Sequence, residues 1–257
     1  MVALVTGASS GIGEATARRI AREPGAQLVL VARREERLKS LADELGGATV
    51  IAADLTDEGA PAQIAEVVEA RHGRLDLLVN NAGAAWRGRF GETGWANVKR
   101  HMELNFDAQV RLTEALLPIL RSSAPAAIVN VSSTAGRVSR ANSGAYSAGK
   151  FALIGWSDAL HLEEAEHGVH VGLVMPGFVA TEGFPQAELR AKAMTRWLVS
   201  KPEKVAEAIM DAGPGGKAER YVPRAYWIAA ALRIVAPRVV RRGASAQAMT
   251  PATPDDD

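Results

Sequence analysis

Short apolar runs alternate with longer amphipathic stretches along most of the chain. The apolar runs predict strands at residues 2–5, 27–32, 49–53, 75–79, 126–131, 169–174 and 221–223. Apolar residues recur at helical spacing in residues 14–22, 35–45, 60–71, 94–121, 144–166 and 202–210. Strands that alternate strictly with helices are typical of right-handed crossovers and a parallel sheet. We therefore predict an α/β fold with one doubly wound parallel sheet of the Rossmann type and helices on both faces.

The length of the chain favours a single domain. α/β chains of about this size commonly form one buried core. We place the domain at residues 1–243. We expect residues 244–257, which contain two prolines and three terminal aspartates, to form a disordered tail.

Composition argues against several classes of function. The 30 basic and 29 acidic residues nearly cancel, so no overall field attracts nucleic acid. The chain has no cysteine, which excludes disulfides, thiolate nucleophiles and cysteine metal sites. No signal peptide or apolar run of about 20 residues is evident, and we expect a cytoplasmic protein. The histidines lack metal-binding spacing, so we predict surface or helix-end roles and no metal for His72, His101, His161, His167 and His170.

A glycine-rich turn follows the first predicted strand and precedes a predicted helix. Its sequence runs Thr6-Gly-Ala-Ser-Ser-Gly-Ile-Gly13. In this context, backbone amides at the helix N-terminus can hold a pyrophosphate, and glycines allow its close approach. The glycine spacing differs from the G-x-G-x-x-G of the commoner dinucleotide fold. The candidate cofactor contacts in this turn are Gly7, Ser10, Gly11, Ile12 and Gly13.

The second predicted strand ends at Ala32 and is followed by two arginines, Arg33 and Arg34. In a dinucleotide site, an acidic residue at this strand end would accept a hydrogen bond from a free ribose 2′-hydroxyl. Arginine suits a 2′-phosphate instead, by charge and by paired hydrogen bonds. The pair therefore predicts NADP(H) rather than NAD(H) as cofactor. Two solvated arginines at a helix start are the alternative.

Tyr146 and Lys150 lie four residues apart in a predicted helix, which places the phenol and the ammonium on one face. A nearby fixed cation lowers the pKa of a phenol, which is otherwise about 10. The phenol could then give or take a proton at neutral pH. Such pairs also arise by chance in many helices, so the surrounding motifs must decide.

Taken together, the motifs resemble the classical short-chain dehydrogenase/reductase family. They occur in the family's order and at its distances over roughly residues 2–181. The matching residues are Thr6 to Gly13, Asp54 and Leu55, Asn80 to Gly83, Asn105, Ser133, Tyr146, Lys150, Pro176, Gly177 and Thr181.

The resemblance implies roles for four catalytic residues. Tyr146 would act as the acid in carbonyl reduction and the base in alcohol oxidation. Ser133 would hold the substrate oxygen, and we choose it over Ser132 because it precedes Tyr146 by thirteen residues and x-x-Gly follows it. Lys150 would bind the nicotinamide ribose and lower the pKa of Tyr146. Asn105 would keep a water that connects Lys150 to solvent.

Further cofactor contacts follow from the resemblance alone. They are Asp54 and Leu55 at the adenine, Asn81, Ala82 and Gly83 on the adenosine side, Val179 and Thr181 at the nicotinamide carboxamide, and Pro176 and Gly177 just before them. Tyr146 and Lys150 would also contact the cofactor. Many NADP-preferring members carry a basic residue where this chain has Ser10, so the predicted preference depends on Arg33 and Arg34.

We predict an NADP(H)-dependent oxidoreductase that interconverts a secondary alcohol and its ketone. Residues 178–200 form a long, partly apolar connection of the kind that covers a site. Five large apolar residues flank the predicted site, namely Trp86, Phe178, Phe184, Met194 and Trp197. We favour the interpretation that they form a pocket for a moderately lipophilic substrate over the alternative that they pack in the core. Two arginines follow Ser133, namely Arg137 and Arg140. They could bind an anionic group of the substrate, or they could be solvated loop residues.

Further expectations concern the class of the protein, its oligomeric state and its contact with a membrane. A dinucleotide-binding regulatory or scaffold protein is the rival class, although the complete Asn, Ser, Tyr and Lys set argues against it. The resemblance also implies a homo-oligomer. Residues 226–242 could lie on a membrane, with Trp227 and the arginines Arg238, Arg241 and Arg242 at its interface. Such a segment more often packs on its own domain or on a neighbouring subunit.

Overall fold

The computed structural model describes the backbone of residues 1–182 and 199–246. Seven described strands form one parallel sheet in the order β3-β2-β1-β4-β5-β6-β9. Their bounds are β1 Val2–Thr6, β2 Gln27–Ala32, β3 Thr49–Ala52, β4 Leu77–Asn80, β5 Ala126–Val131, β6 Val169–Pro176 and β9 Glu219–Val222. This sheet confirms the predicted Rossmann-type α/β fold.

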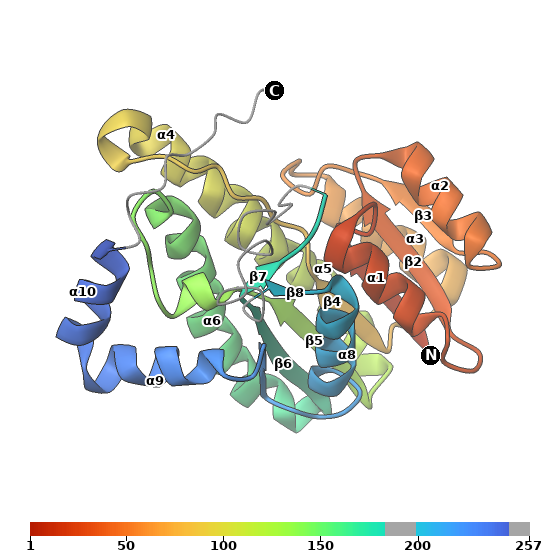
Figure 1. The fold of residues 1–257 in the computed structure, drawn as a ribbon. Helices are drawn as coiled ribbons and strands as arrows, with labels where there is room; N and C mark the ends of the chain where they lie inside the picture. The colour runs from red at the N-terminus through yellow and green to blue at the C-terminus, as the bar shows by residue number, and fades with distance from the viewer. Residues whose placement is uncertain (183–198, 247–257) are drawn as a thin grey trace.

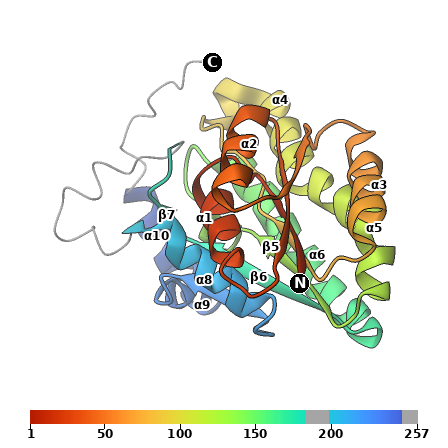
Figure 2. The same cartoon turned by 90° about the vertical axis from the view of Figure 1, so that its right-hand side faces the viewer.

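Helices cover both faces of the sheet (Figures 1 and 2). One face carries α1 Gly11–Ile20, α2 Glu35–Glu44 and α8 Pro202–Ala212. The other carries α3 Ala60–His72, α5 Ala108–Ser122 and α6 Gly144–Glu164. The strands divide their side chains between the two layers, so in β1 Ala3 and Val5 face α1 while Leu4 faces the α3 layer. Burial on both faces explains why the strands are almost continuously apolar.

Two polar contacts hold α6 in place against its neighbours. The Asn130 side-chain amide at the centre of the sheet donates a 2.7 Å hydrogen bond to the Ser157 hydroxyl. At the far end of α6, the buried carboxylate of Glu164 accepts two hydrogen bonds from the Arg121 guanidinium on α5. Buried charges need such partners. The helix that carries Tyr146 is therefore fixed at both its middle and its end.

Residues 94–121 do not form the single continuous helix that the sequence predicted. The structure forms α4 Phe90–Met102, a wide π-helical segment Glu103–Asp107, and then α5. Gly94 breaks α4 with a φ of 58°, a value that favours glycine. Within the π segment, the Asn105 amide donates to the backbone oxygens of His101 and Ala84. A tertiary contact, the one to Ala84, thus accompanies the break.

The predicted cover over the site, residues 178–200, is described only at its ends. There, β7 Phe178–Val179 pairs in parallel with β8 Val199–Ser200. Residues 183–198, with Phe184, Met194 and Trp197, lie outside the described residues.

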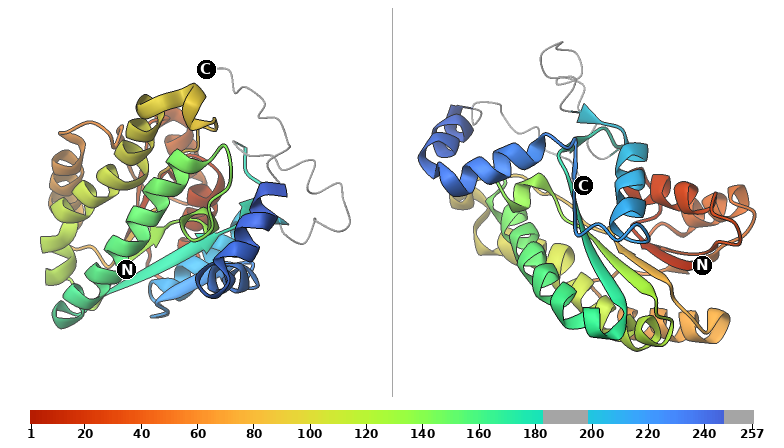
Figure 3. Two further views of the ribbon diagram at one scale, coloured as in Figure 1. Left: turned by 90° about the vertical axis from the view of Figure 1, so that its left-hand side faces the viewer. Right: turned by 90° about the horizontal axis from the view of Figure 1, so that it is seen from below.

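The C-terminal part forms two helices at the β9 end of the sheet, remote from α2 and β3 (Figure 3). These are α9 Tyr226–Val235 and α10 Pro237–Ala246. The first three residues of the predicted tail therefore belong to α10, and residues 247–257 lie outside the described residues. Among the described helices, none has the length and apolar character needed to span a bilayer.

Candidate active site

The carboxyl ends of the strands bring the predicted site residues to one edge of the sheet. Thr6 at the end of β1 donates its hydroxyl to the Val79 carbonyl oxygen at 3.1 Å. The same hydroxyl accepts from the backbone amides of Asn81 and Ala82, each at 2.9 Å. The Asn81 side-chain amide donates back to the Thr6 carbonyl oxygen. These bonds hold the glycine turn after β1 against the predicted adenosine-side residues after β4.

The glycine turn is packed so tightly that it leaves no room for a side chain at Gly7 or Gly13. A Cβ at Gly13 would lie 2.2 Å from the Gly7 carbonyl oxygen. Gly7 and Gly11 have φ values of 65° and 59°, which disfavour other residues. α1 begins within this turn, and its first amides have no partner inside the helix. The turn therefore fits the phosphates of a dinucleotide, held by backbone amides.

The two arginines after β2 take different positions. The Arg34 guanidinium lies on the glycine turn, 2.7 Å from the Ser10 hydroxyl and 3.2 Å from the Ser9 hydroxyl. The Arg33 side chain is 78% exposed and lies 3.6 Å from the Asp54 carboxylate. Although burial opposes the shift, the pKa of Asp54 is lowered by two hydrogen bonds from Thr56 and by Arg33.

Sequence reasoning missed an ion-pair group beside Arg34. The Glu182 carboxylate binds the Arg37 guanidinium through both oxygens and lies 3.6 Å from Arg34. Arg37 follows Arg33 by four residues, so the helical spacing was a readable signal. Glu182 gave no such signal, because only the fold brings it to α2.

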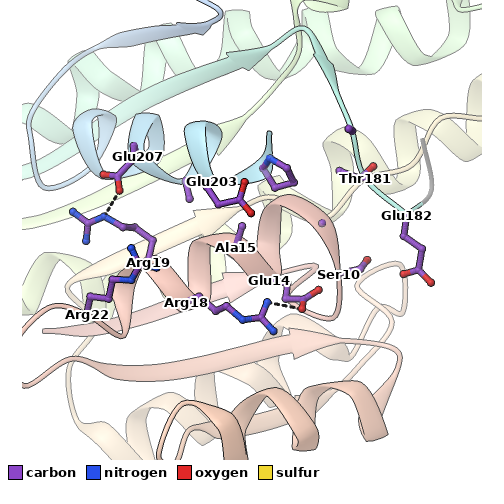
Figure 4. Close-up of a pocket in the computed structure, with 14 residues that line it drawn as sticks. Ser10, Glu14, Ala15, Arg18, Arg19, Arg22, Thr181, Glu182, Glu203 and Glu207 are labelled. Carbon is purple, nitrogen blue, oxygen red and sulfur yellow. Dashed lines mark hydrogen bonds and ion pairs between the residues drawn. The ribbon is translucent and has the colours of Figure 1, made fainter. Parts of the chain in front are cut away.

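A groove of about 410 Å³ runs from the glycine turn between α1 and α8 (Figure 4). Ser10, Thr181 and Glu182 line one end, on the right in Figure 4, and the Arg19–Glu207 ion pair lies toward the other end, on the left. None of the four predicted catalytic residues lines it. The groove thus extends only the cofactor part of the site.

Ser133 and Tyr146 meet at the end of β5. The serine hydroxyl lies close enough to the phenol to lower its pKa, and it donates to the Pro176 carbonyl oxygen at 3.4 Å. Ser133 precedes a short 3₁₀ helix, Thr134–Gly136, and caps it by accepting from the Ala135 amide at 3.1 Å. The Ser132 hydroxyl instead donates to the Lys150 carbonyl oxygen. Of the two serines, Ser133 is therefore the one that the fold brings to the phenol.

The pKa of Tyr146 differs in direction from the sequence expectation. Burial raises the pKa of the phenol, and the Ser133 hydroxyl and the Arg140 charge only oppose this rise. Lys150 is itself buried, and burial lowers the pKa of its ammonium to about 7. Its Nζ lies 6.0 Å from the centre of the Tyr146 ring and donates to the Val131 carbonyl oxygen at 2.9 Å. Within the protein alone, desolvation outweighs the predicted effect of the cation.

Asn105 and Lys150 both lie close to Gly83. A Cβ at Gly83 would lie 2.7 Å from Asn105 Oδ1 and 3.4 Å from Lys150 Nζ. Asn105 Oδ1 is buried and accepts no hydrogen bond from a described residue. Buried acceptors normally find a donor. This oxygen is therefore a candidate acceptor for the predicted water.

His101 lies in the last turn of α4, which agrees with the predicted helix-end role, but it is not at the surface. It is fully buried, and its ring lies edge-on to the Tyr146 ring at 6.2 Å between centroids. The Trp86 amide donates to Nε2, and the Asn97 carbonyl oxygen lies 2.8 Å from Nδ1. Burial lowers the pKa of the imidazole, which favours the neutral form. His101 supports the loop beside the phenol.

Trp86 and Phe178 are the described aromatic residues among those predicted to form a lipophilic pocket, and each contacts an arginine. The Arg100 guanidinium lies 3.5 Å from the centre of the Trp86 ring, and that of Arg140 lies 4.5 Å from the centre of the Phe178 ring. Arg140 forms no ion pair with a described residue, whereas Arg137 pairs with Glu219. Arg137 thus has a carboxylate partner in the protein, and its side chain remains partly exposed.

Comparisons with known proteins agree with this geometry. A family model described as short chain dehydrogenase matches residues 1–191. The chain is 35% identical over 251 residues to the uncharacterized oxidoreductase YxnA of Bacillus subtilis, covering 94% of this chain and 70% of that protein. It is 32% identical over 213 residues to the ketoacyl reductase HetN of a Nostoc strain, covering 81% and 74%.

A third relative is longer than the matched region. The chain is 34% identical over 190 residues to the dehydrogenase/reductase SDR family member 7B of zebrafish, covering 70% of this chain and 61% of that protein. The chain thus spans about three fifths of the length of this relative. The match to the family model extends over most of the chain and includes the glycine turn, Ser133, Tyr146 and Lys150. The chain belongs to the short-chain dehydrogenase family of NAD(P)(H)-dependent oxidoreductases.

Proposed function

We propose that the protein is an NADP(H)-dependent carbonyl reductase that interconverts a ketone and its secondary alcohol. The observation that carries this proposal is that Ser133 and Tyr146 lie together beside buried Lys150, at the edge to which the glycine turn opens. A protein that only binds a dinucleotide needs no such cluster of buried ionisable groups, whose desolvation is costly.

The cofactor would lie along this edge of the sheet. The glycine turn would hold its phosphates, and Arg34 would bind the 2′-phosphate with help from Ser10 and Arg33. The nicotinamide supplies or accepts the hydride when bound. The remaining proposed contacts are Ile12, Asp54, Leu55, Asn81, Ala82, Gly83, Tyr146, Lys150, Pro176, Gly177, Val179 and Thr181.

Tyr146 and Ser133 would bind the same substrate oxygen, because the fold brings the two hydroxyl-bearing side chains together at the end of β5. The raised pKa keeps the phenol protonated at neutral pH, which suits a donor to the oxygen of a ketone under reduction. The Ser133 hydroxyl would stabilise the charge that develops there. The side chains therefore favour the reductive direction.

Lys150 and Asn105 would return a proton to Tyr146 and hold the nicotinamide ribose. With a pKa of about 7, the Lys150 amine exchanges protons readily at neutral pH. Asn105 Oδ1 and Lys150 Nζ both lie close to Gly83, and a water between them would accept from the ammonium and donate to the amide oxygen. This arrangement supports a proton relay from solvent.

The substrate would be a moderately lipophilic ketone. Phe178 and Trp86 support this choice, and one relative is named a ketoacyl reductase. Arg140 stacks on Phe178 without a described carboxylate partner, which also suits a ketone that carries an anionic group.

A substrate panel tests the proposal directly. Purified protein is mixed with NADPH or NADH and with neutral aliphatic ketones, steroidal ketones, keto acids or ketoacyl esters. Loss of reduced-nicotinamide absorbance is expected with NADPH and at least one lipophilic ketone. Tight NADPH binding without turnover of any carbonyl, or of the corresponding alcohols with NADP⁺, would favour the scaffold alternative.

We also propose a homo-oligomer in the cytoplasm. The exposed apolar side chains Phe151 and Leu162 on α6 support association of subunits. Sedimentation velocity of the purified protein tests the assembly, and a single species at monomer mass would reject it.

A further inference from the structure

Large apolar side chains are exposed on both C-terminal helices. Of the α9 residues, only Ala230 is buried. Ile228, Leu232 and Val235 follow helical spacing along one exposed side, and Trp227 and Ile234 lie next to them, seven residues apart. Val239 on α10 is also exposed. We call these six residues the α9–α10 face.

The size of these side chains makes the face unusual. Trp227 is 56% exposed, and Ile234 and Val235 are 76% and 77% exposed. Single exposed apolar residues are common on proteins, but contiguous groups of large ones mark interaction surfaces. The face therefore requires a partner surface that accepts apolar side chains.

The charged side chains of the chain segment that carries the face are all positive. Between Glu219 and Asp255 the chain has no acidic residue, although it has six arginines. These are Arg220, Arg224, Arg233, Arg238, Arg241 and Arg242. Arg220 pairs with Asp211, whereas Arg224, Arg233 and Arg238 form no ion pair with a described residue. In a chain of net charge +1, this segment carries a strong local excess of positive charge.

This combination selects among possible partners. A symmetric contact between two copies would bring the same arginine-rich patch against itself, and like charges would repel. An anionic lipid surface offers apolar chains to the aliphatic residues and phosphates to the arginines. Tryptophan suits the boundary between these two layers.

We propose that α9 and α10 dock the protein on the surface of an anionic membrane. The aliphatic side chains of the α9–α10 face enter the boundary between headgroups and acyl chains, and the neighbouring arginines contact lipid phosphates. The helices lie on the bilayer and do not cross it. This docking is independent of the proposed reaction.

The position of α9 brings the docked surface close to the catalytic edge. The Tyr226 ring at the start of α9 lies against Gly177, where an added Cβ would be 2.3 Å from a ring carbon. Gly177 directly follows the end of β6. The membrane would therefore lie beside the substrate side of the candidate site.

Vesicle co-sedimentation of the full chain tests the proposal. The probes are vesicles of phosphatidylcholine alone and vesicles that also contain phosphatidylserine. We expect binding to the mixed vesicles that weakens as salt is raised, because salt screens the attraction of arginines to phosphates. Absence of binding to the mixed vesicles would overturn the proposal.

Substitutions in the face should act in matched pairs. Trp227→Glu should weaken vesicle binding at least tenfold, whereas Trp95→Glu should leave it unchanged, because Trp95 is 68% exposed on α4 and lies outside the face. Arg238→Ala should weaken it about fivefold, and Arg71→Ala on α3 should not. Trp227→Phe keeps an aromatic side chain and should retain most of the binding.

Two controls keep the result interpretable. Circular dichroism melts should show that Trp227→Glu is folded, since the side chain is exposed. If Trp227→Glu and Trp95→Glu bind vesicles equally, the face is not the lipid contact. If Trp227→Glu instead dissociates an oligomer in sedimentation velocity and leaves vesicle binding intact, the face is a subunit interface and the proposal fails. The vesicle experiments do not depend on the substrate panel. A protein that reduces no ketone in the panel could still bind vesicles through this face.

Discussion

The glycine turn and the cluster of Ser133, Tyr146 and Lys150, here called the Tyr146 cluster, lie at the same edge of the sheet. They differ in which atoms of the chain form them. The glycine turn is made of backbone, and its shape depends on absent side chains, as the 2.2 Å approach at Gly13 shows. The Tyr146 cluster is made of side chains that the core desolvates, with Lys150 only 3% exposed. Changes in the first should therefore alter affinity, and changes in the second should alter protonation and rate.

The largest expected effect is that of Tyr146→Phe. The variant removes the proposed proton donor but keeps the ring, so kcat should fall about 10²- to 10⁴-fold while the Kd for NADPH changes less than about twofold. Steady-state kinetics and a fluorescence titration measure the two quantities. Tyr221→Phe is the matched control, because this phenol contacts Arg137 and Glu219 instead. Activity within about threefold of the wild type would remove Tyr146 from the mechanism.

Lys150→Met tests the cost of burying the ammonium. A buried lysine with a pKa of about 7 binds fewer protons in the folded state than in the unfolded state, where its pKa is near 10.5. Between these values the unfolded state binds more protons, so wild-type stability should rise with pH relative to the variant. We expect the difference in unfolding free energy to move by about 3 kcal/mol from pH 7 to pH 10. Urea unfolding at both pH values measures it, and a pH-independent difference contradicts the buried cation.

Gly13→Ala tests the backbone character of the cofactor turn. The new Cβ would meet the Gly7 carbonyl oxygen, so the turn must shift. NADPH affinity should fall at least about tenfold, and the unfolding free energy should fall by about 1–3 kcal/mol. Gly91→Ala on α4 is the control, because an added Cβ meets no atom there. Equal affinities for the two variants would contradict the tight turn.

Arg34→Ala and Arg33→Ala give the smallest expected effects. Arg34 contacts the glycine turn and should contribute about tenfold to NADPH affinity, whereas exposed Arg33 should contribute about threefold. NADH affinity should change less than about twofold in both variants, because NADH has no 2′-phosphate. Calorimetric titrations with both cofactors measure these ratios. Equal losses for NADPH and NADH would place the 2′-phosphate elsewhere.

The sequence predicted what depends on local pattern. Buried strands, their alternation with helices and the glycine turn all follow from short-range periodicity, so the fold and the edge that carries the motifs were predictable. The pKa of Tyr146 was not, because spacing along a helix reveals a neighbouring ammonium but not the desolvation of both groups. The contact between Glu182 and Arg37 was missed for a similar reason, since 145 residues separate its partners.

The wide turn at Glu103–Asp107 takes up one residue more than a regular α-helical turn. Deleting one residue there would close it to a regular helix and leave the later side chains of α5 in phase, so Leu112 and Leu116 would still face the core. Asn105, however, would lose its place at Gly83. A one-residue deletion in this segment should therefore disturb the candidate site more than the core.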